Sequence, residues 1–382
     1  MKIVIAPDSF KGSCSAVAVA DSIEKGIKRV DAECDVVKIP IADGGEGTVE
    51  ALVLSTGGTL RQKRVAGPLG DMVTAQYGIL KNGVGVVELA AASGLTLIHE
   101  KLRDPWNTTT YGTGQLILAA IDDGCKKIVV GLGGSATNDG GMGIAQAFGV
   151  SFLDQDGKEL GFGGGQLERL ATINTENLDY QLKEREIIIA CDVTNLLCGP
   201  EGASYIYGPQ KGGTPEKVEA LDLNLKHYAE VILKQLHTDV KDISGAGAAG
   251  GSAIPLLLFT NARIESGIKV ILDITEIDKH FQNADLVITG EGRIDGQSIF
   301  RKVPVGVAAR AKQYDLPVLA ITGGIGKGAE SCYKHGIDSI MSIVNGPMLL
   351  SEAMDKAEEL TADAAERAFR IMRMGMNLKN SK

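Results

Sequence analysis

Short runs of β-branched and other apolar residues alternate with helix-like segments near both ends of the chain. This alternation is typical of parallel βαβ units, in which helices cover both faces of the sheet. At the N-terminal end, strands are expected at residues 2–6 and 35–41 and helices at 16–30 and 48–54. At the C-terminal end, strands are expected at 285–289, 317–321 and 338–344 and helices at 305–314, 329–335 and 351–374. We therefore predict an α/β fold in which the two ends build halves of one doubly wound sheet.

The middle of the chain has a different pattern. Between residues 65 and 88, Gly-Pro, Gly-Asp and Asn-Gly pairs separate short strands as in antiparallel hairpins. Helices are expected at 110–123 and 215–237, the second with Thr214 as N-cap. The chain has 382 residues, whereas hydrophobic cores usually split beyond about 250–300 residues. We therefore predict two domains, one formed by residues 1–62 plus 268–382 and the other a mixed α/β domain inserted at residues 63–267.

Composition excludes several classes of function. The formal net charge is -9, which opposes nonspecific binding to nucleic acid and to anionic membranes. The six cysteines form no CxxC pair and have no partners at zinc spacing, so a reduced, cytoplasmic chain is expected. Because a strand is expected directly at residues 2–6, we expect no secretory leader, and no apolar run reaches the length of a membrane span. The assembly state stays open, and a homodimer is compatible with the sequence.

Loops rich in glycine, acidic residues or hydroxyl groups follow five of the apolar runs. They occupy residues 7–13, 42–48, 131–141, 191–195 and 290–298. In open α/β sheets, ligands bind outside the carboxyl ends of the strands, which is where these loops begin. Phosphoryl transfer needs backbone N–H groups at close approach, a cation, and carboxylates that hold Mg²⁺. The five loops together supply all of these groups and predict a phosphoryl-transfer site.

The loop at 131–141 is the predicted nucleotide-binding loop. Its glycines allow close approach of the backbone to phosphates, and its hydroxyl and amide side chains add donors. The alternative is a loop that serves only tight packing between a strand and a helix. The residues assigned to nucleotide binding are Gly133, Gly134, Ser135, Thr137 and Asn138.

Charged residues in the remaining loops are candidates for catalysis. Asp8 is either a turn cap or a catalytic carboxylate, and Lys11 either a solvated charge or a phosphate ligand. Asp192 follows three isoleucines, so it is either a structural cap or a general base with a tuned pKa. Lys211, in a loop too rich in glycine to be a helix face, is a candidate phosphate contact.

Metal ligands are expected in two of these loops, and substrate ligands at residue 9 and between residues 293 and 302. Asp43 and Glu46 flank two glycines, which favours exposed carboxylates near a metal or substrate over an ion pair. Both are assigned as metal ligands, and Glu291 is a third candidate. Arg293 is expected either to bind a substrate carboxylate or to pair with Glu291. The residues assigned to substrate binding are Ser9, Arg293, Asp295, Ser298 and Lys302.

Taken in order, these strings resemble the type I glycerate kinases. The resemblance lies in Ala-Pro-Asp-Ser-Phe-Lys-Gly-Ser at 6–13, Ala-Asp-Gly-Gly-Glu-Gly-Thr at 42–48, and Gly-Leu-Gly-Gly-Ser-Ala-Thr-Asn-Asp-Gly-Gly at 131–141. It continues in Asp-Val-Thr-Asn at 192–195, Gly-Pro-Gln-Lys-Gly at 208–212, Gly-Ala-Ala-Gly-Gly at 247–251 and Thr-Gly-Glu-Gly-Arg-Ile-Asp at 289–295. Cys14, Leu196 and Arg301 depart from the usual family pattern.

The resemblance implies a Rossmann- or flavodoxin-like domain made from both chain ends, an inserted α/β domain and a cleft between them. It also implies ATP and Mg²⁺ as cosubstrates and glycerate as the acceptor, with 2-phosphoglycerate favoured over 3-phosphoglycerate. Asp192 is expected to deprotonate the glycerate hydroxyl as it attacks the γ-phosphorus. Lys11 and Lys211 are expected to balance the phosphate charge.

Two other functions stay open at this point. A nicotinamide dehydrogenase is suggested by Gly131-x-Gly133-x-x-Ala136, which follows a strand and has Asp154 eighteen residues beyond its end. A noncatalytic binding protein for a small organic acid would use the glycines as hinges. A P-loop NTPase is excluded, because the string GxxxxGK[ST] does not occur.

Overall fold

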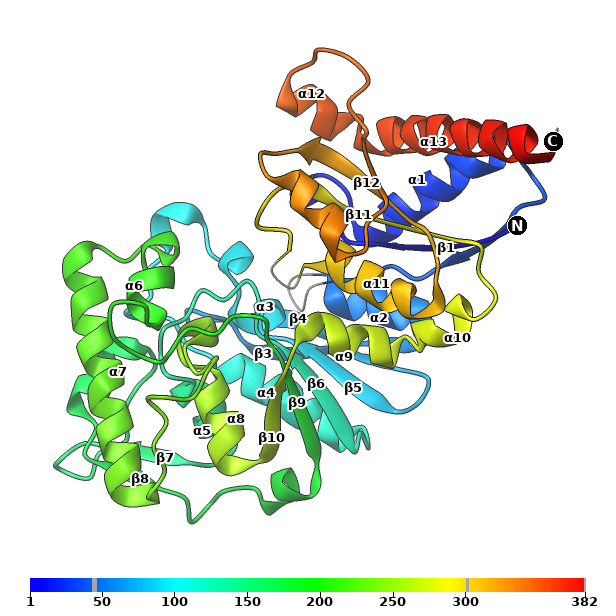
Figure 1. Ribbon diagram of the computed structural model, residues 1–382. Helices are drawn as coiled ribbons and strands as arrows, with labels where there is room; N and C mark the ends of the chain where they lie inside the picture. The colour runs from blue at the N-terminus through cyan, green and yellow to red at the C-terminus, as the bar shows by residue number, and fades with distance from the viewer. Residues whose placement is uncertain (43–46, 300–301, 381–382) are drawn as a thin grey trace. The chain divides into compact units, whose positions relative to one another are not determined.

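The computed structural model describes residues 1–42, 47–299 and 302–380, with side chains described as far as residue 377 (Figure 1). Contacts between residues divide the chain into two compact units. Unit 1 comprises Met1–Asp43, Leu54–Thr56 and Ile268–Lys382. Unit 2 comprises Gly44–Val53 and Gly57–Gly267.

Unit 1 is built on a five-stranded sheet in the order β13-β12-β11-β1-β2, and every pairing in it is parallel. The strands are β1 (Lys2–Pro7), β2 (Asp35–Lys38), β11 (Leu286–Ile294), β12 (Val318–Ile325) and β13 (Ser339–Ser342). The sheet joins the two ends of the chain, because β1 pairs with β11 from Ile3↔Leu286 to Pro7↔Gly290. The carboxyl ends of these two strands therefore lie next to each other.

The helices of unit 1 are α1 (Ala16–Lys28), α9 (Gly267–Ile274), α10 (Ile277–Phe281), α11 (Val303–Ala311), α12 (Leu350–Asp355) and α13 (Ala357–Asn380), and α2 (Thr48–Thr56) contributes its end. Short 3-10 helices lie at Lys312–Tyr314 and Ala329–His335. Helices α1 and α13 lie side by side (Figure 1). Ile23 and Ile27 of α1 and Phe369 of α13 pack with strand residues such as Ile5 in one buried core.

Unit 2 is built on a six-stranded mixed sheet in the order β10-β9-β6-β5-β4-β3. The strands are β3 (Thr59–Ala66), β4 (Met72–Ile79), β5 (Val84–Glu88), β6 (Lys127–Gly131), β9 (Glu186–Ala190) and β10 (Asn261–Glu265). Strands β3, β4 and β5 pair antiparallel, which confirms the expected hairpins, and β5, β6, β9 and β10 pair parallel. A separate hairpin consists of β7 (Ser151–Leu153) and β8 (Thr172–Asn174).

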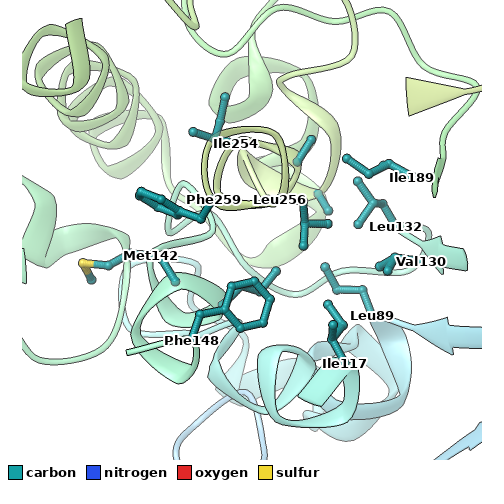
Figure 2. Packing of buried hydrophobic residues seen from close by; sticks show 14 of the residues in the cluster. Leu89, Ile117, Val130, Leu132, Met142, Phe148, Ile189, Ile254, Leu256 and Phe259 are labelled. Carbon is teal, nitrogen blue, oxygen red and sulfur yellow. The ribbon is translucent and has the colours of Figure 1, made fainter. Parts of the chain in front are cut away.

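The helices of unit 2 are α3 (Ala90–Ser93), α4 (Tyr111–Asp122), α5 (Met142–Ala147), α6 (Ala203–Tyr207), α7 (Pro215–Leu236) and α8 (Ala253–Phe259). Short 3-10 helices lie at Leu95–Leu97, Glu100–Leu102, Gly164–Arg169, Tyr180–Glu184, Pro209–Lys211 and Ala248–Gly250. Helix α7 begins as expected, because the Thr214 side chain accepts a hydrogen bond from the Lys217 N–H. Figure 2 shows part of the core, where Phe148 and Phe259 pack with Val130 and Ile189 of the sheet.

These sheets confirm the α/β class, and several expected boundaries need correction. Strand β2 ends at Lys38 rather than at residue 41, although the N–H groups of Ile39 and Ile41 still donate to the Ile5 and Pro7 carbonyl oxygens of β1. The helix expected at 329–335 is a 3-10 helix. The closing helix expected at 351–374 is divided into α12 and α13, and α13 continues to Asn380. No helix among the described residues is both long enough and apolar enough to cross a bilayer.

Candidate active site

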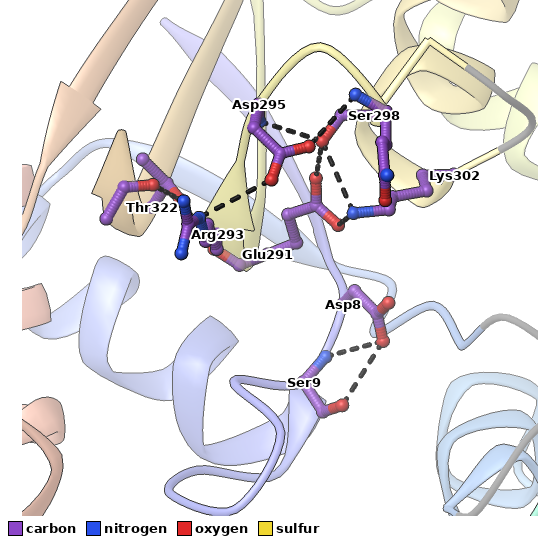
Figure 3. Close-up of polar contacts among 10 residues, drawn as sticks. Asp8, Ser9, Glu291, Arg293, Asp295, Ser298, Lys302 and Thr322 are labelled. Atoms are coloured by element: carbon purple, nitrogen blue, oxygen red, sulfur yellow. Dashed lines mark hydrogen bonds and ion pairs between the residues drawn. The ribbon is translucent and has the colours of Figure 1, made fainter. Parts of the chain in front are cut away.

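In unit 1, the carboxyl ends of β1 and β11 bring the first polar residues together. Asp8 follows β1 directly, and its N–H donates to the Gly290 carbonyl oxygen of β11 at 2.8 Å. The Asp8 side chain is buried, and its Oδ1 accepts hydrogen bonds from the Ser9 N–H at 2.7 Å and the Ser9 hydroxyl at 3.3 Å (Figure 3). Asp8 and Ser9 therefore form a fixed polar pair at the edge of this sheet.

Lys11 lies at the exposed tip of a tight turn beside this pair. The turn is closed by hydrogen bonds between the backbones of Phe10 and Cys14, and Gly12 within it has a φ of 77°. This left-handed conformation favours glycine. The turn is also attached to α12, since the Ser13 hydroxyl donates to the Met354 carbonyl oxygen at 2.8 Å. The fold thus places Lys11 on an exposed turn of defined shape.

Glu291 and Arg293 correct one expectation, because they lie within β11 and not in a loop. Strand β11 continues to Ile294, where Glu291 pairs with Thr322 of β12 and Arg293 with Gly324. The Glu291 side chain is buried, whereas Arg293 is exposed. Arg293 pairs with Asp295 and not with Glu291, its Nε lying 3.4 Å from Asp295 Oδ2.

Ser298 is the centre of a buried hydrogen-bond network around Glu291 (Figure 3). Its hydroxyl donates to Glu291 Oε1 at 2.5 Å and accepts from the Asp295 N–H at 3.1 Å. Lys302 Nζ lies 3.4 Å from Ser298 Oγ and 3.5 Å from Glu291 Oε2. Burial raises the pKa of Glu291, and the Ser298 hydrogen bond and the Lys302 charge oppose this rise. All four residues were expected in the site, and the structure brings them together.

In unit 2, the loop after β6 accepts two hydrogen bonds from the side chain of Lys211. Its Nζ donates to Ser135 Oγ at 2.8 Å and to the Thr137 carbonyl oxygen at 2.6 Å, and the side chain is only 2% exposed. Burial lowers the pKa of Lys211 to about 7, and the charge of Asp139 acts in the opposite direction. Gly133 and Gly134, in contrast, are exposed. The loop therefore combines an accessible glycine backbone with a buried cation behind it.

Thr137 and Asn138 lie in the interior of unit 2, each fully buried. The Asn138 side-chain amide donates to the Ser204 hydroxyl at 2.9 Å. Thr137 Oγ1 and Asn138 Oδ1 have no hydrogen-bond partner among the described residues. Their side chains face the protein interior. Sequence alone assigns them to nucleotide binding together with Gly133 and Gly134, which are exposed.

Asp192 follows β9 and is partly buried. Its Oδ1 accepts hydrogen bonds from the Ser266 hydroxyl at 2.7 Å and from the Gly267 N–H at 3.1 Å. Gly267 is the first residue of α9, so one carboxylate oxygen of Asp192 is held at the start of that helix. This arrangement is compatible with both functions expected for Asp192, the structural cap and the oriented base.

Sequence reasoning did not identify Asp139 and Thr110, which hold the end of the loop after β6 from the interior of unit 2. Asp139 is fully buried and accepts hydrogen bonds from the N–H and the hydroxyl of Thr110, each at 2.8 Å. Thr108, two residues earlier, donates from its hydroxyl to the Ala136 carbonyl oxygen at 2.8 Å. The run of three threonines at 108–110 ahead of α4 was the available signal.

Two expected metal ligands, Asp43 and Glu46, lie outside the described residues. Within the described part of the chain, no group of three or more His, Cys, Asp or Glu side chains is arranged to hold a metal ion.

The fold argues against the dehydrogenase alternative. A dinucleotide-binding unit needs its acidic residue at the end of the next parallel strand. Asp154 instead follows β7, which belongs to the separate antiparallel hairpin, and its Oδ2 lies 2.5 Å from the Arg169 guanidinium. Asp154 also accepts hydrogen bonds from the Asp156 and Lys158 N–H groups of its own turn.

Known proteins resemble the chain along nearly its whole length. The model of the glycerate kinase family matches residues 3–373. Glycerate 2-kinase of Escherichia coli is 48% identical over 377 residues, covering 98% of this chain and 99% of the relative. Glycerate kinase of Bacillus subtilis is 48% identical over 360 residues and covers 94% of each chain.

A crystal structure from Salmonella typhimurium LT2, which carries the provisional name glycerate kinase 2, superposes with a TM-score of 0.88. It is 46% identical in sequence, and the match covers 99% of both chains. The chain therefore belongs to the glycerate kinase family and is a kinase, an enzyme that transfers a phosphoryl group.

Proposed function

We propose that this protein transfers the γ-phosphoryl group of ATP to glycerate in the presence of Mg²⁺ and forms 2-phosphoglycerate and ADP. The observation that carries the proposal is the Lys211 ammonium, held by Ser135 and Thr137 behind the exposed Gly133-Gly134 backbone. A cation at a glycine-rich loop is the combination that binds polyphosphate, because it supplies charge neutralisation and close-approaching N–H groups. The acceptor and the position of phosphorylation are proposed from the glycerate kinase and glycerate 2-kinase relatives.

In this proposal, the nucleotide contacts the exposed part of the loop, at Gly133 and Gly134, and Ser135 orients Lys211. Thr137 and Asn138 hold the loop in place rather than contacting the nucleotide, because their side chains are fully buried. Lys11, in the turn that follows Asp8 and Ser9, is proposed as a further cation for the phosphates.

The acceptor is proposed to bind through unit 1. Arg293 is exposed and Lys302 is partly exposed, so both side chains are accessible to the glycerate carboxylate. Ser298 and Asp295 hold Lys302 and Arg293 respectively, as the contacts in Figure 3 indicate. Ser9, fixed by Asp8, is a hydroxyl donor for the acceptor.

Asp192 is proposed as the general base. The hydrogen bonds from Ser266 and Gly267 to its Oδ1 fix the orientation of the carboxylate. The glycerate hydroxyl transfers its proton to Asp192 as its oxygen attacks the γ-phosphorus, and ADP leaves with the electrons of the broken P–O bond. Asp8 is the alternative proton acceptor.

The described carboxylates fit Mg²⁺ as oxygen donors. Mg²⁺ usually keeps several waters and is held by one or two carboxylates together with substrate phosphates, so it needs no cage of three protein ligands. Glu291 is the proposed ligand among the described residues, and Asp43 and Glu46 are proposed from the sequence. When bound, the ion neutralises charge on the transferring phosphate.

We also infer that unit 1 is a doubly wound domain of flavodoxin type. Its strand order, β2-β1-β11-β12-β13, corresponds to the 2-1-3-4-5 order of that class. A cytoplasmic location is proposed because all six cysteines are free thiols, as is usual in a reducing compartment.

The test is an assay of glycerate-dependent ADP release with ATP and Mg²⁺, with the product identified by ³¹P NMR. Phosphorus of 2-phosphoglycerate couples to one carbon-bound proton, whereas that of 3-phosphoglycerate couples to two. We expect the 2-isomer and a requirement for Mg²⁺. Absence of glycerate-dependent ADP release would refute the activity, and the 3-isomer would refute only the proposed position.

A further inference from the structure

Asp139 is a buried carboxylate at the end of the loop after β6, and none of the steps above uses it. Its two oxygens accept four hydrogen bonds. Two come from Thr110, and the other two come from the N–H groups of Gly141 at 3.1 Å and Gly143 at 3.3 Å. All four partners are donors, which is the environment of an ionised carboxylate. Burial raises the pKa of Asp139, and the hydrogen bonds from Thr110, Gly141 and Gly143 act against this rise and favour the carboxylate.

Lys211 is the buried positive group attached to the same loop. Its two hydrogen-bond partners, Ser135 Oγ and the Thr137 carbonyl oxygen, are both neutral. A buried ammonium with only neutral partners is costly, because neutral oxygens replace its hydration without balancing its charge. Asp139 lies two residues after Thr137, and its charge acts on Lys211 in the direction that favours the ammonium.

We propose that Asp139 is a positioning residue of the kinase, which keeps Lys211 in its charged form and fixes the end of the phosphate-binding loop. The inference rests on the proposed function, since it assigns Asp139 a part in the same site.

Tyr228 and Arg103 face the glycines next to Asp139 and Lys211. The Tyr228 ring faces Gly140, where an added Cβ would lie 2.7 Å from the ring, and burial raises the pKa of Tyr228 above its ordinary value. Tyr228 therefore stays neutral. The Arg103 backbone faces Gly212, next to Lys211. Asp139 raises the pKa of Lys211 against the lowering effect of burial.

The first experiment measures kcat/KM against pH for Asp139→Asn. The substitution keeps the shape and removes the charge, so Lys211 should lose its proton at lower pH. We expect the alkaline limb of the profile to move toward acid by about one pH unit. Tyr228→Phe is the matched control, because it removes a hydroxyl from the same buried region without changing the charge, and it should leave the limb in place.

The second experiment needs no activity and measures melting temperatures for Asp139→Asn, Lys211→Met and the double variant. Asp139→Asn should lower the melting temperature more when Lys211 is present than in the Lys211→Met background. If Asp139→Asn alone does not fold, the double variant should recover folding.

These outcomes separate the two proposals. An unmoved alkaline limb, equal losses in both backgrounds, or a double variant that still fails to fold would overturn the role of Asp139. If the wild type lacks glycerate kinase activity, the proposed function fails, and the melting temperatures still decide whether the two charges are coupled.

Discussion

Gly250→Ala tests whether the loop that holds Lys211 depends on close backbone packing. Gly250 is buried and has a φ of 71°. A Cβ there would lie 2.2 Å from the Thr137 carbonyl oxygen and 2.5 Å from Asn138 Cα. Both are backbone atoms and cannot rotate away, so the loop itself must move. The displaced oxygen is the one that accepts the 2.6 Å hydrogen bond from Lys211.

Gly157→Ala is the matched control. Gly157 has a φ of 75°, and nothing lies within 4 Å of its added Cβ. Both substitutions therefore place alanine in the left-handed region, at a cost of roughly 1–2 kcal/mol each. Only Gly250→Ala adds a steric clash, which typically costs about 1–3 kcal/mol. For a domain of about 150–250 residues, each kcal/mol lowers the melting temperature by roughly 2–4 °C.

The assay compares thermal unfolding and glycerate-dependent ADP release for both variants. Gly250→Ala should melt several degrees below Gly157→Ala, and its kcat/KM should fall by up to about 10²-fold, since small displacements of catalytic groups have effects of this size. Gly157→Ala should keep the wild-type kcat/KM. Equal melting temperatures together with unchanged activity in both variants would refute the reasoning that the loop needs this contact.

Other expected outcomes concern the proposed base, the Glu291 network, pH and metal. Asp192→Asn should lower kcat by about 10²–10⁴-fold while circular dichroism shows a folded protein. Full turnover in this variant would show that another residue is the general base. Ser298→Ala removes the 2.5 Å hydrogen bond to the buried Glu291 Oε1 and should destabilise the protein by about 1–3 kcal/mol in urea unfolding. Because Lys211 must be charged and its pKa is about 7, kcat/KM should decline as pH rises through this value, and a flat profile to pH 9 would contradict that requirement. Chelation by EDTA should stop turnover, and added Mg²⁺ should restore it.

Local sequence patterns were sufficient for the α/β class and for many helices. Thr214 followed by Pro215 marks the start of α7 by capping chemistry that needs no tertiary information. The string Gly290-Glu291-Gly292 was wrongly assigned to a loop, because its glycines are typical of a turn. In the structure, Gly290 lies in β11, and a Cβ there would meet the Ile321 carbonyl oxygen at 2.0 Å. Glycine is required at this position because the backbone of the neighbouring strand lies so close, and local sequence does not reveal that strand.

For the candidate site, the sequence predicted which types of residue take part but not their contacts or their burial. Lys211 and Ser135 are 76 residues apart in sequence, so neither their contact nor the burial of the lysine follows from a local pattern. Asp139 was overlooked for the same reason, since its partner Thr110 comes from a segment 29 residues earlier. Sequence reasoning ranks polar residues in loops as ligands, and it cannot distinguish a side chain that faces solvent from one that holds the loop from inside.

Glycines in and around the loop after β6 show why sequence alone cannot separate a packing role from a ligand-binding role. Both roles require small residues there. Gly133 and Gly134 are exposed, so their lack of side chains leaves the backbone open to a ligand. Gly164 and Gly251, from other segments, press against the same loop from inside, where a Cβ would lie 2.3 Å from the Asn138 carbonyl oxygen and 2.7 Å from Gly140 Cα respectively. Tight packing was the alternative to ligand binding at the level of sequence. In the structure, tight packing holds the buried half of the loop, and a loop held in this way can present its exposed half to phosphate without first having to become ordered.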